Sequence, residues 1–124
     1  MFNEMLAMAS GSGGSDPNEN LKKISLVLIN QGAGTPAYGG MEFDASEFKT
    51  LTIGSIKLVG TASGSSNYIR LYRNDGSTVV KTFTVSDAPQ SVDISSYNEV
   101  LKLRVFYIFT QAYKLISFNE IELE

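Results

Sequence analysis

The sequence predicts an all-β domain, and three observations lead to that prediction. From residue 21 onward, short apolar runs alternate with turn residues about every ten positions, a spacing that indicates short strands. The chain is 43% hydrophobic, and the β-favouring residues Val, Ile, Phe and Tyr are prominent in it. No segment after residue 21 shows a convincing helical period. About eight strands with such spacing indicate a β-sandwich or barrel.

Three strands are expected in the first part of the domain. Apolar residues alternate with others over 24–28, and this strand ends before the Gly- and Pro-containing stretch 30–36. A brief strand is expected at 41–44. The next covers 51–61, and a change in its apolar parity places Gly54-Ser55 at a bulge or bend.

A hairpin is expected in the middle of the domain. Over 68–72, Ile69 and Leu71 share one face of a strand. Asn74-Asp75-Gly76 follows, and these residue types tolerate the positive φ that tight turns require. The returning strand is expected over 78–85.

Three further strands are expected toward the end of the chain. The first is a short one at 91–94. The clearest alternation lies over 101–109, where Lys102 and Arg104 occupy the face opposite the apolar residues. The last strand covers 115–123 and contains a second change in apolar parity.

The first twenty residues differ in composition from the rest. An apolar leader, Met1 to Ala9, precedes a Gly/Ser-rich stretch over 10–20 that is typical of a flexible linker. The leader has amphipathic spacing but is too short for a stable free helix, so we expect it to order on a partner. The residues expected to dock are Phe2, Met5, Leu6 and Met8. The alternative is an engineered extension, although it contains no affinity tag and no His.

The predicted organisation is therefore a docking peptide and linker over 1–20 and a β-sandwich domain over 21–124. The leader lacks the positive start of an export signal, and no apolar run approaches the roughly 18 residues that cross a bilayer. A net charge of -3 without clustered Lys or Arg argues against nucleic-acid binding.

The residue inventory argues against catalysis. Without His or Cys the chain has no imidazole base, no thiolate nucleophile and no common transition-metal ligand. No nucleophile elbow, phosphate loop or metalloprotease helix occurs. Asp44 with Glu47, or Asn74 with Asp75, offers oxygen atoms for calcium, but turn formation explains Asn74-Asp75 more simply. We expect no enzyme, no cofactor and no metal site.

Four segments of the domain resemble galactose-binding-like jelly-roll domains. They are Phe43 to Leu58, Tyr68 to Tyr72, Val92 to Tyr97 and Ile116 to Leu123. In that family a VDIS-Y stretch precedes a long apolar strand, and the final strand ends in an I-x-L pattern, as in this sequence. The resemblance implies a jelly-roll β-sandwich of about eight antiparallel strands.

The leader carries a second resemblance. The opening Met-Phe-Asn-Glu-Met-Leu-Ala-Met-Ala-Ser-Gly-Ser-Gly-Gly looks like the N-termini of small structural proteins of tailed bacteriophages. Such proteins pair a short leader with a β-sandwich and serve as capsid decoration, head fibres or tail accessories. The resemblance implies location in a virion and capsid or tail subunits as partners.

A candidate glycan site comes from aromatic and cationic residues. Tyr68 and Tyr72 flank Arg70 on one strand face and offer stacking surfaces and a bidentate donor. Tyr38 and Tyr113, in expected loops, are further candidates. The alternative interpretation of the Tyr-Arg-Tyr face is cross-strand packing, and the absence of Trp favours that alternative.

Three functions are therefore expected, in this order. The first is a non-enzymatic phage virion accessory protein, anchored to capsid or tail by its N-terminal peptide and displaying the sandwich. The second is a carbohydrate-binding module that aids adsorption to host glycans, which is compatible with the first. The third is a homo-oligomer, for instance a trimer, that only stabilises neighbouring subunits.

Overall fold

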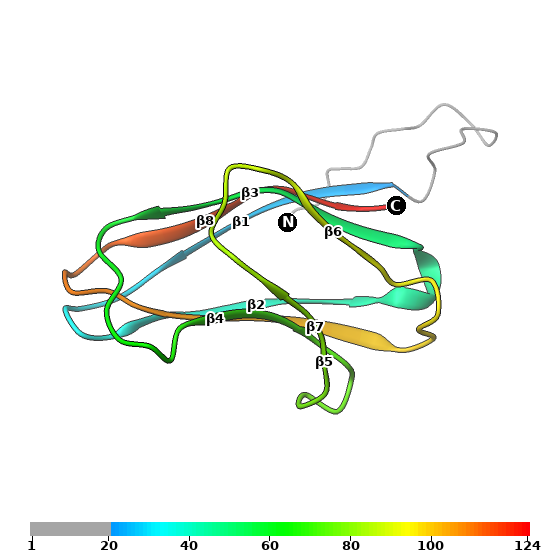
Figure 1. Cartoon of the computed structure of the whole chain (residues 1–124), viewed down its shortest axis with the longest axis horizontal. Helices are drawn as coiled ribbons and strands as arrows, with labels where there is room; N and C mark the ends of the chain where they lie inside the picture. Colours follow the sequence, from blue (N-terminus) through cyan, green and yellow to red (C-terminus); the bar gives the residue numbers. More distant parts are fainter. Residues whose placement is uncertain (1–20) are drawn as a thin grey trace.

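Two four-stranded antiparallel sheets pack face to face in the computed structural model of this chain (Figure 1). The structure describes residues 21–124, so the predicted docking peptide and linker over 1–20 lie outside the described residues. The prediction of an all-β sandwich is confirmed. No helix among the described residues is long and apolar enough to span a membrane.

The eight strands start and end close to the predicted positions. Apart from the second strand, every boundary lies within two residues of its prediction. The elements are β1 (Lys22–Ile29), β2 (Pro36–Asp44), η2 (Ala45–Glu47), β3 (Thr50–Val59), β4 (Tyr68–Tyr72), β5 (Val79–Phe83), β6 (Gln90–Asp93), β7 (Val100–Ile108) and β8 (Leu115–Leu123).

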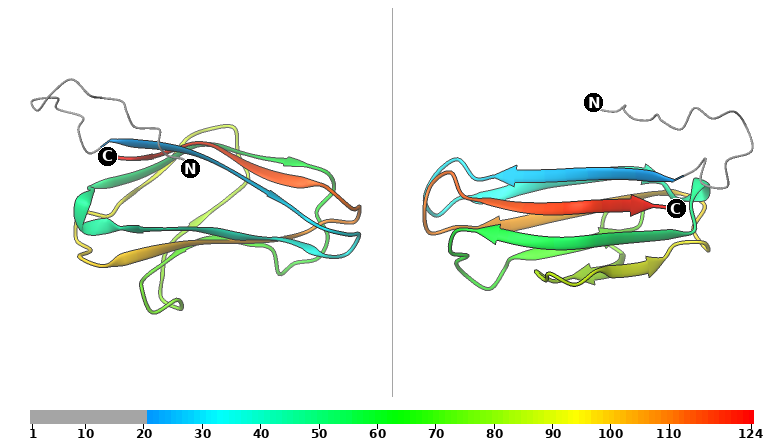
Figure 2. Two further views of the ribbon diagram at one scale, coloured as in Figure 1. Left: turned by 180° about the vertical axis from the view of Figure 1, so that it is seen from behind. Right: turned by 90° about the horizontal axis from the view of Figure 1, so that it is seen from above.

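The strand order is that of a jelly roll. One sheet has the order β1-β8-β3-β6 and the other has the order β2-β7-β4-β5 (Figure 2). From β1 to β4, each strand lies in the opposite sheet to the strand before it. β5 lies beside β4 in the same sheet, and from β5 to β8 the strands alternate between the sheets again. Each sheet is therefore built from distant parts of the chain. All ladders between the strands are antiparallel.

The core lies between the sheets and is built from the inward half of each alternating strand. In β7, Leu101, Leu103 and Val105 are fully buried while the residues between them are partly exposed. Phe109 and Phe118 are the largest fully buried side chains. The described residues 21–124 by themselves form a contiguous hydrophobic core.

One buried polar side chain joins two loops at one end of the sandwich. Asn30 is fully buried, and its Nδ2 donates to the carbonyl oxygens of Gly32 at 2.9 Å and Gln111 at 2.8 Å. Its Oδ1 accepts from the backbone N–H of Lys114 at 2.6 Å. The amide is thus hydrogen-bonded at both ends, as a buried polar group requires, and it ties the β1–β2 loop to the β7–β8 loop.

The second strand is longer than predicted, and this changes the place of one candidate residue. β2 begins at Pro36, so Tyr38 lies in a strand, and its prediction as a loop residue is wrong. Gly39 and Gly40 suggested a loop, yet they pair with Val105 and Arg104 in the ladder to β7. Their φ values of 153° and 154° are open to glycine and rare for other residues, so the two glycines continue the strand.

The two expected parity changes lie directly opposite each other in adjacent strands. In β3 the buried side chains change from odd-numbered to even-numbered positions at Gly54-Ser55, and in β8 they change from even-numbered to odd-numbered positions at Asn119-Glu120. The β3–β8 register stays constant across this point because both strands change together. The irregularity appears instead between β8 and β1, after Ile24, where Glu120 adopts a positive φ of 57°.

Candidate binding face

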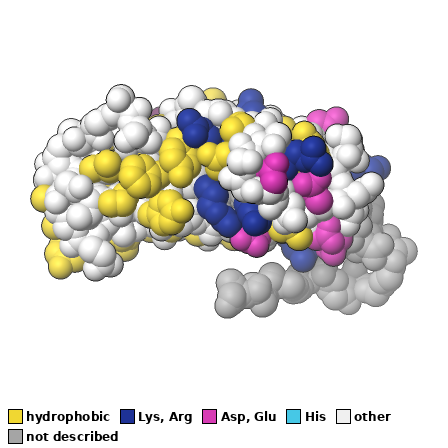
Figure 3. Space-filling view, turned by 90° about the horizontal axis from the view of Figure 1, so that it is seen from below, with side chains coloured by type: hydrophobic (Ala, Val, Ile, Leu, Met, Phe, Trp, Pro, Cys, Tyr) yellow, Lys and Arg dark blue, Asp and Glu magenta, His cyan; other side chains and the backbone are white. Residues whose placement is uncertain are grey.

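The outer face of the β2-β7-β4-β5 sheet presents three rows of side chains, which we call the tyrosine–arginine face. Each row crosses β2, β7 and β4 at directly paired positions. The aromatic row is Tyr38–Phe106–Tyr68, the arginine row is Gly40–Arg104–Arg70, and the third row is Glu42–Lys102–Tyr72. Figure 3, which views this side of the molecule, shows hydrophobic side chains gathered in one area with Lys and Arg directly beside them.

The aromatic row is a continuous cluster of three rings. The Phe106 ring meets Tyr38 edge to face, with centroids 6.0 Å apart. On its other side it lies nearly parallel to Tyr68, at 5.8 Å and an interplanar angle of 10°. Both distances fall within the range in which aromatic pairs attract.

Tyr38 and Tyr68 differ in how much of their surface is open. Tyr38 is at the edge strand β2 and is 62% exposed. Tyr68 lies between Phe106 and Arg70, whose guanidinium carbon is 4.6 Å from the Tyr68 ring centre. Burial raises the pKa of the Tyr68 hydroxyl. Tyr38 is therefore the ring that can accept a stacking ligand, and Tyr68 supports the cluster.

The arginine row holds two arginines at directly paired backbone positions of adjacent strands. Arg70 and Arg104 are direct cross-strand partners in the β4–β7 ladder. Arg70 Nη1 donates to the Tyr72 hydroxyl at 3.2 Å. Arg104 Nη2 donates to the Glu42 carboxylate at 2.5 Å, and this hydrogen bond lowers the pKa of Glu42 below its usual value.

The structure gathers four of the five candidate glycan residues on this one face. Tyr68, Arg70 and Tyr72 share the outward side of β4, as their spacing predicts, and Tyr38 joins them through Phe106. Tyr113 does not join them in a row. It lies in the loop between β7 and β8, 73% exposed and with a positive φ of 58°.

Two side chains of the aromatic and arginine rows were missed as candidates. Phe106 and Arg104 have the same outward parity on β7, and Arg104 was recognised only as lying opposite the apolar face. The alternation of 101–109 was the signal that could have included them. Alternation within β7 does not give the register of this strand. Only the pairing of β7 with β2 and β4 shows which residues Phe106 and Arg104 meet.

The carboxylates considered for calcium serve as turn caps. Asp44 Oδ1 accepts hydrogen bonds from the backbone N–H and hydroxyl of Ser46. Asp75 accepts from the N–H of Ser77 and from the N–H and hydroxyl of Thr78, which lowers its pKa to about 2. Within residues 21–124 no three acidic side chains gather where they could hold a metal ion.

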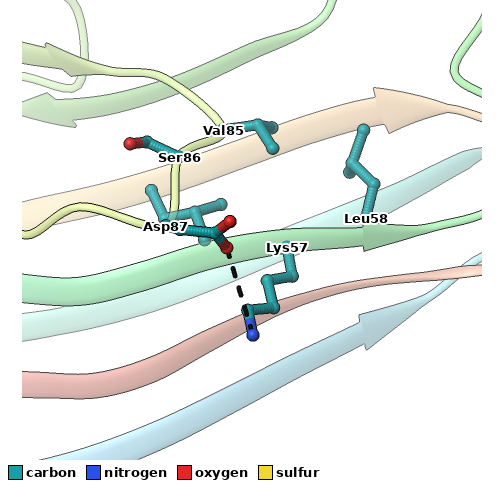
Figure 4. Close-up of a pocket in the computed structure, with 6 residues that line it drawn as sticks. Lys57, Leu58, Val85, Ser86 and Asp87 are labelled. Atoms are coloured by element: carbon teal, nitrogen blue, oxygen red, sulfur yellow. Dashed lines mark ion pairs between the residues drawn. The ribbon is translucent and has the colours of Figure 1, made fainter.

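A second surface feature is a shallow, open groove between β3 and the segment that leads to β6. It is lined by Ile56, Lys57 and Leu58 on one side and by Val85, Ser86 and Asp87 on the other (Figure 4). Backbone hydrogen bonds between Ile56 and Ser86 close its floor, and Lys57 lies 4.0 Å from Asp87. The groove offers no aromatic ring, and its one cation is paired.

No protein-family model matches this chain, and searches of curated proteins and of solved structures find no match either. The jelly-roll fold therefore rests on the strand order, and function must be argued from the tyrosine–arginine face itself.

Proposed function

We propose that the sandwich is a non-enzymatic carbohydrate-binding module and that the tyrosine–arginine face is its binding surface. The single observation that carries this proposal is the exposed Tyr38 ring, held edge to face by Phe106 beside two arginines. Sugar rings have apolar faces that pack on aromatic rings and hydroxyls that accept hydrogen bonds from guanidinium groups. The face offers both kinds of group on one flat surface.

The rigidity of the surface supports the proposal. Phe106 and Arg104 project from the central strand β7, which is hydrogen-bonded on both sides. Tyr68 is held between Phe106 and Arg70, so its ring is already ordered before any ligand binds. A preorganised surface loses little side-chain entropy when it binds, and this favours recognition by few contacts.

The competing explanation is that the aromatic row only stabilises the sheet by cross-strand packing. That explanation accounts for Phe106 and Tyr68, which cover each other. It accounts less well for Tyr38, most of whose surface remains in water. Among the described residues Phe106 is the one ring that meets Tyr38, and packing against it leaves most of Tyr38 uncovered.

A glycan array probed with the full chain and with Tyr38→Ala tests the proposal. We expect the wild type to bind a defined set of glycans and Tyr38→Ala to bind them at least about tenfold more weakly, the equivalent of about 1.4 kcal/mol. Tyr113→Ala is the matched control, since it removes a tyrosine that is even more exposed and lies outside the three rows. Equal binding by wild type and Tyr38→Ala would remove the proposal.

Display on a larger assembly is a second candidate function, favoured by one sequence observation. The apolar leader with Phe2, Met5, Leu6 and Met8 is joined to the domain through a Gly/Ser-rich stretch. A phage virion accessory protein, attached to capsid or tail by this leader, would hold the sandwich outward and bring the tyrosine–arginine face to host glycans.

Deletion of residues 1–12 tests that second function. The core of the sandwich is built from residues of 21–124, so the shortened chain should fold with an unchanged melting temperature. It should no longer incorporate into virus particles. Normal incorporation of the shortened chain would remove the accessory role and leave the carbohydrate proposal untouched.

A further inference from the structure

Charge is distributed unevenly over the tyrosine–arginine face. Arg70, Arg104 and Lys102 lie in the arginine row and the third row, and Glu42 is the one carboxylate that pairs with them there. Like charges at directly opposite positions of a sheet destabilise it. The Arg70–Arg104 pair is such an arrangement at directly paired backbone positions, and of the two only Arg104 has a carboxylate partner among the described residues.

Arg70 has unused hydrogen-bonding capacity. Among the described residues, no carboxylate lies within ion-pair distance of Arg70, and its guanidinium donates only to the Tyr72 hydroxyl through Nη1. The Nε and Nη2 donors therefore find no acceptor within residues 21–124. Arginine presents its donors as a planar fork that matches the two oxygens of an acidic group.

We infer that the saccharide recognised by this face carries an acidic group, a carboxylate, sulfate or phosphate, which is bound between Arg70 and Arg104 while its ring lies on Tyr38 and Phe106. This inference rests on the proposed carbohydrate-binding function and specifies its ligand class. An anion placed between the two guanidinium groups would relieve their repulsion and occupy the free fork of Arg70.

The spacing of the rows fits such a ligand. Tyr38 and Gly40 are two residues apart on β2, as are Phe106 and Arg104 on β7. Two residues of an antiparallel strand span about 6.8 Å. That length allows one sugar ring to lie on the aromatic row while its acidic substituent reaches the arginine row.

Gly40 keeps one side of the arginine row uncovered. It is the β2 partner of Arg104 and contributes no side chain. A Cβ there would meet the Leu103 carbonyl oxygen at 1.7 Å, so no other residue fits this backbone. Arg104 thus has only Glu42 as a charged neighbour from β2, and a ligand must compete with that one carboxylate.

An array that pairs each acidic glycan with its neutral parent tests the inference. It holds sialylated, uronate-containing, sulfated and phosphorylated glycans, which separates the three acidic groups. We expect the full chain to bind acidic members at least about tenfold more tightly than their parents. Equal binding to the acidic and the neutral member of each pair would overturn the inference of an acidic ligand but would leave the proposed carbohydrate binding intact. Binding to neither member would overturn both the inference and the proposed function.

Two substitutions, measured by calorimetry with the best acidic glycan of the array, locate the acidic group. Arg70→Gln should weaken binding about tenfold. Lys57→Gln removes the same charge from the outer face of the other sheet and should leave affinity unchanged. An unchanged affinity in Arg70→Gln would overturn the inference.

Glu42→Gln gives a test in the opposite direction. The Glu42 carboxylate is half exposed and competes with the ligand for Arg104, so its removal should tighten binding by about threefold. Because this variant keeps the size and hydrogen-bonding shape of the side chain, it should fold normally. Weaker binding by Glu42→Gln would contradict the inference that the Glu42 carboxylate and the acidic group of the ligand compete for Arg104.

Inorganic polyphosphate serves as the control for attraction by charge alone. If it competes with a labelled glycan for the wild-type chain as effectively as the same unlabelled glycan does, the face binds any polyanion and the inference of an acidic saccharide is wrong. We expect polyphosphate to compete at least about tenfold less well than the glycan with the wild type, because it cannot use the aromatic row.

Discussion

The two outer faces of the sandwich are built on the same kind of sheet and carry different chemistry. The β2-β7-β4-β5 sheet presents rings and guanidinium groups, and its central strand β7 contributes Phe106 and Arg104. The β1-β8-β3-β6 sheet presents aliphatic, hydroxyl and ion-paired side chains, such as Thr52, whose hydroxyl lies 2.7 Å from that of Ser91, and the pair Lys23–Glu122. The inward faces are equally apolar, so the difference lies in the outward positions alone.

The second face also has an apolar area, but of another kind. Ile29, Leu115 and Val59 form a row at directly paired positions of β1, β8 and β3. Ile29 and Val59 are about half exposed. These aliphatic side chains offer neither a flat ring nor a hydrogen-bond donor. The two faces therefore differ in the kind of apolar surface that they expose, and only the tyrosine–arginine face places rings beside hydrogen-bond donors.

The largest loss of stability is expected from substitution of Gly40, which leaves one side of the arginine row uncovered. Gly40→Ala places a Cβ against the Leu103 backbone, at a φ of 154°, and should lower the free energy of unfolding by more than about 4 kcal/mol or prevent folding. Gly54→Ala, on the other sheet, meets Asn119 O at 2.9 Å and should cost less. Urea unfolding of both variants measures the difference, and equal costs would contradict this ranking.

Phe106→Ala should have the next largest effect. The ring contacts both Tyr38 and Tyr68, so its removal should cost about 2 kcal/mol of unfolding free energy and also abolish glycan binding. Leu115→Ala is the matched change on the central strand of the other face and should cost less, with unchanged binding. Thermal melts and calorimetry check both, and loss of binding in Leu115→Ala would break the comparison of the faces.

Acid sensitivity should differ between turns of the two sheets. The folded-state pKa of Asp75, in the β4–β5 turn, is about 2, below its ordinary value of 3.8, because Thr78 and Ser77 donate hydrogen bonds to it. Its stabilising effect is present above about pH 4 and is lost as pH falls toward 2. Asp75→Asn should therefore be less stable at pH 7 and lose less stability between pH 4 and 2.

Asp93, the last residue of β6 in the other sheet, is the control for that measurement. Its pKa is also lowered, by hydrogen bonds from Ser95 alone. Asp93→Asn should change the pH dependence of the melting temperature less than Asp75→Asn does. The reverse order would show that the count of hydrogen bonds does not govern acid stability in these turns.

The smallest effect on stability is expected at Tyr38. Most of its surface is exposed and Phe106 is its one aromatic partner among the described residues, so Tyr38→Ala should change the free energy of unfolding by less than about 0.5 kcal/mol. Its effect on glycan affinity should be large by comparison. A stability loss near that of Phe106→Ala would favour the structural explanation of the aromatic row.

Much of the fold could be predicted because strand alternation is a local property. The outward side of Tyr68, Arg70 and Tyr72 and the parity change at Gly54-Ser55 follow from apolar spacing alone. The first half of β2 was missed because Gly39-Gly40 is a common loop signal, whereas here it continues a strand.

The candidate site could be predicted only in part because its rows are long-range. Arg70 and Arg104 are far apart in the sequence and become neighbours through the β4–β7 register. The same register brings Phe106 between Tyr38 and Tyr68. Spacing within one strand carries no information on which strand will pair with it or at which residue.

Amide chemical shifts of the full chain, recorded by NMR during titration with the tightest-binding glycan of the array, test the central claim most directly. The account predicts that the largest shift changes cluster at Tyr38, Arg104, Phe106 and Arg70, on the outer face of the β2-β7-β4-β5 sheet. Changes that cluster instead on the opposite face, around Val27, Lys57 and Ser117, would contradict it.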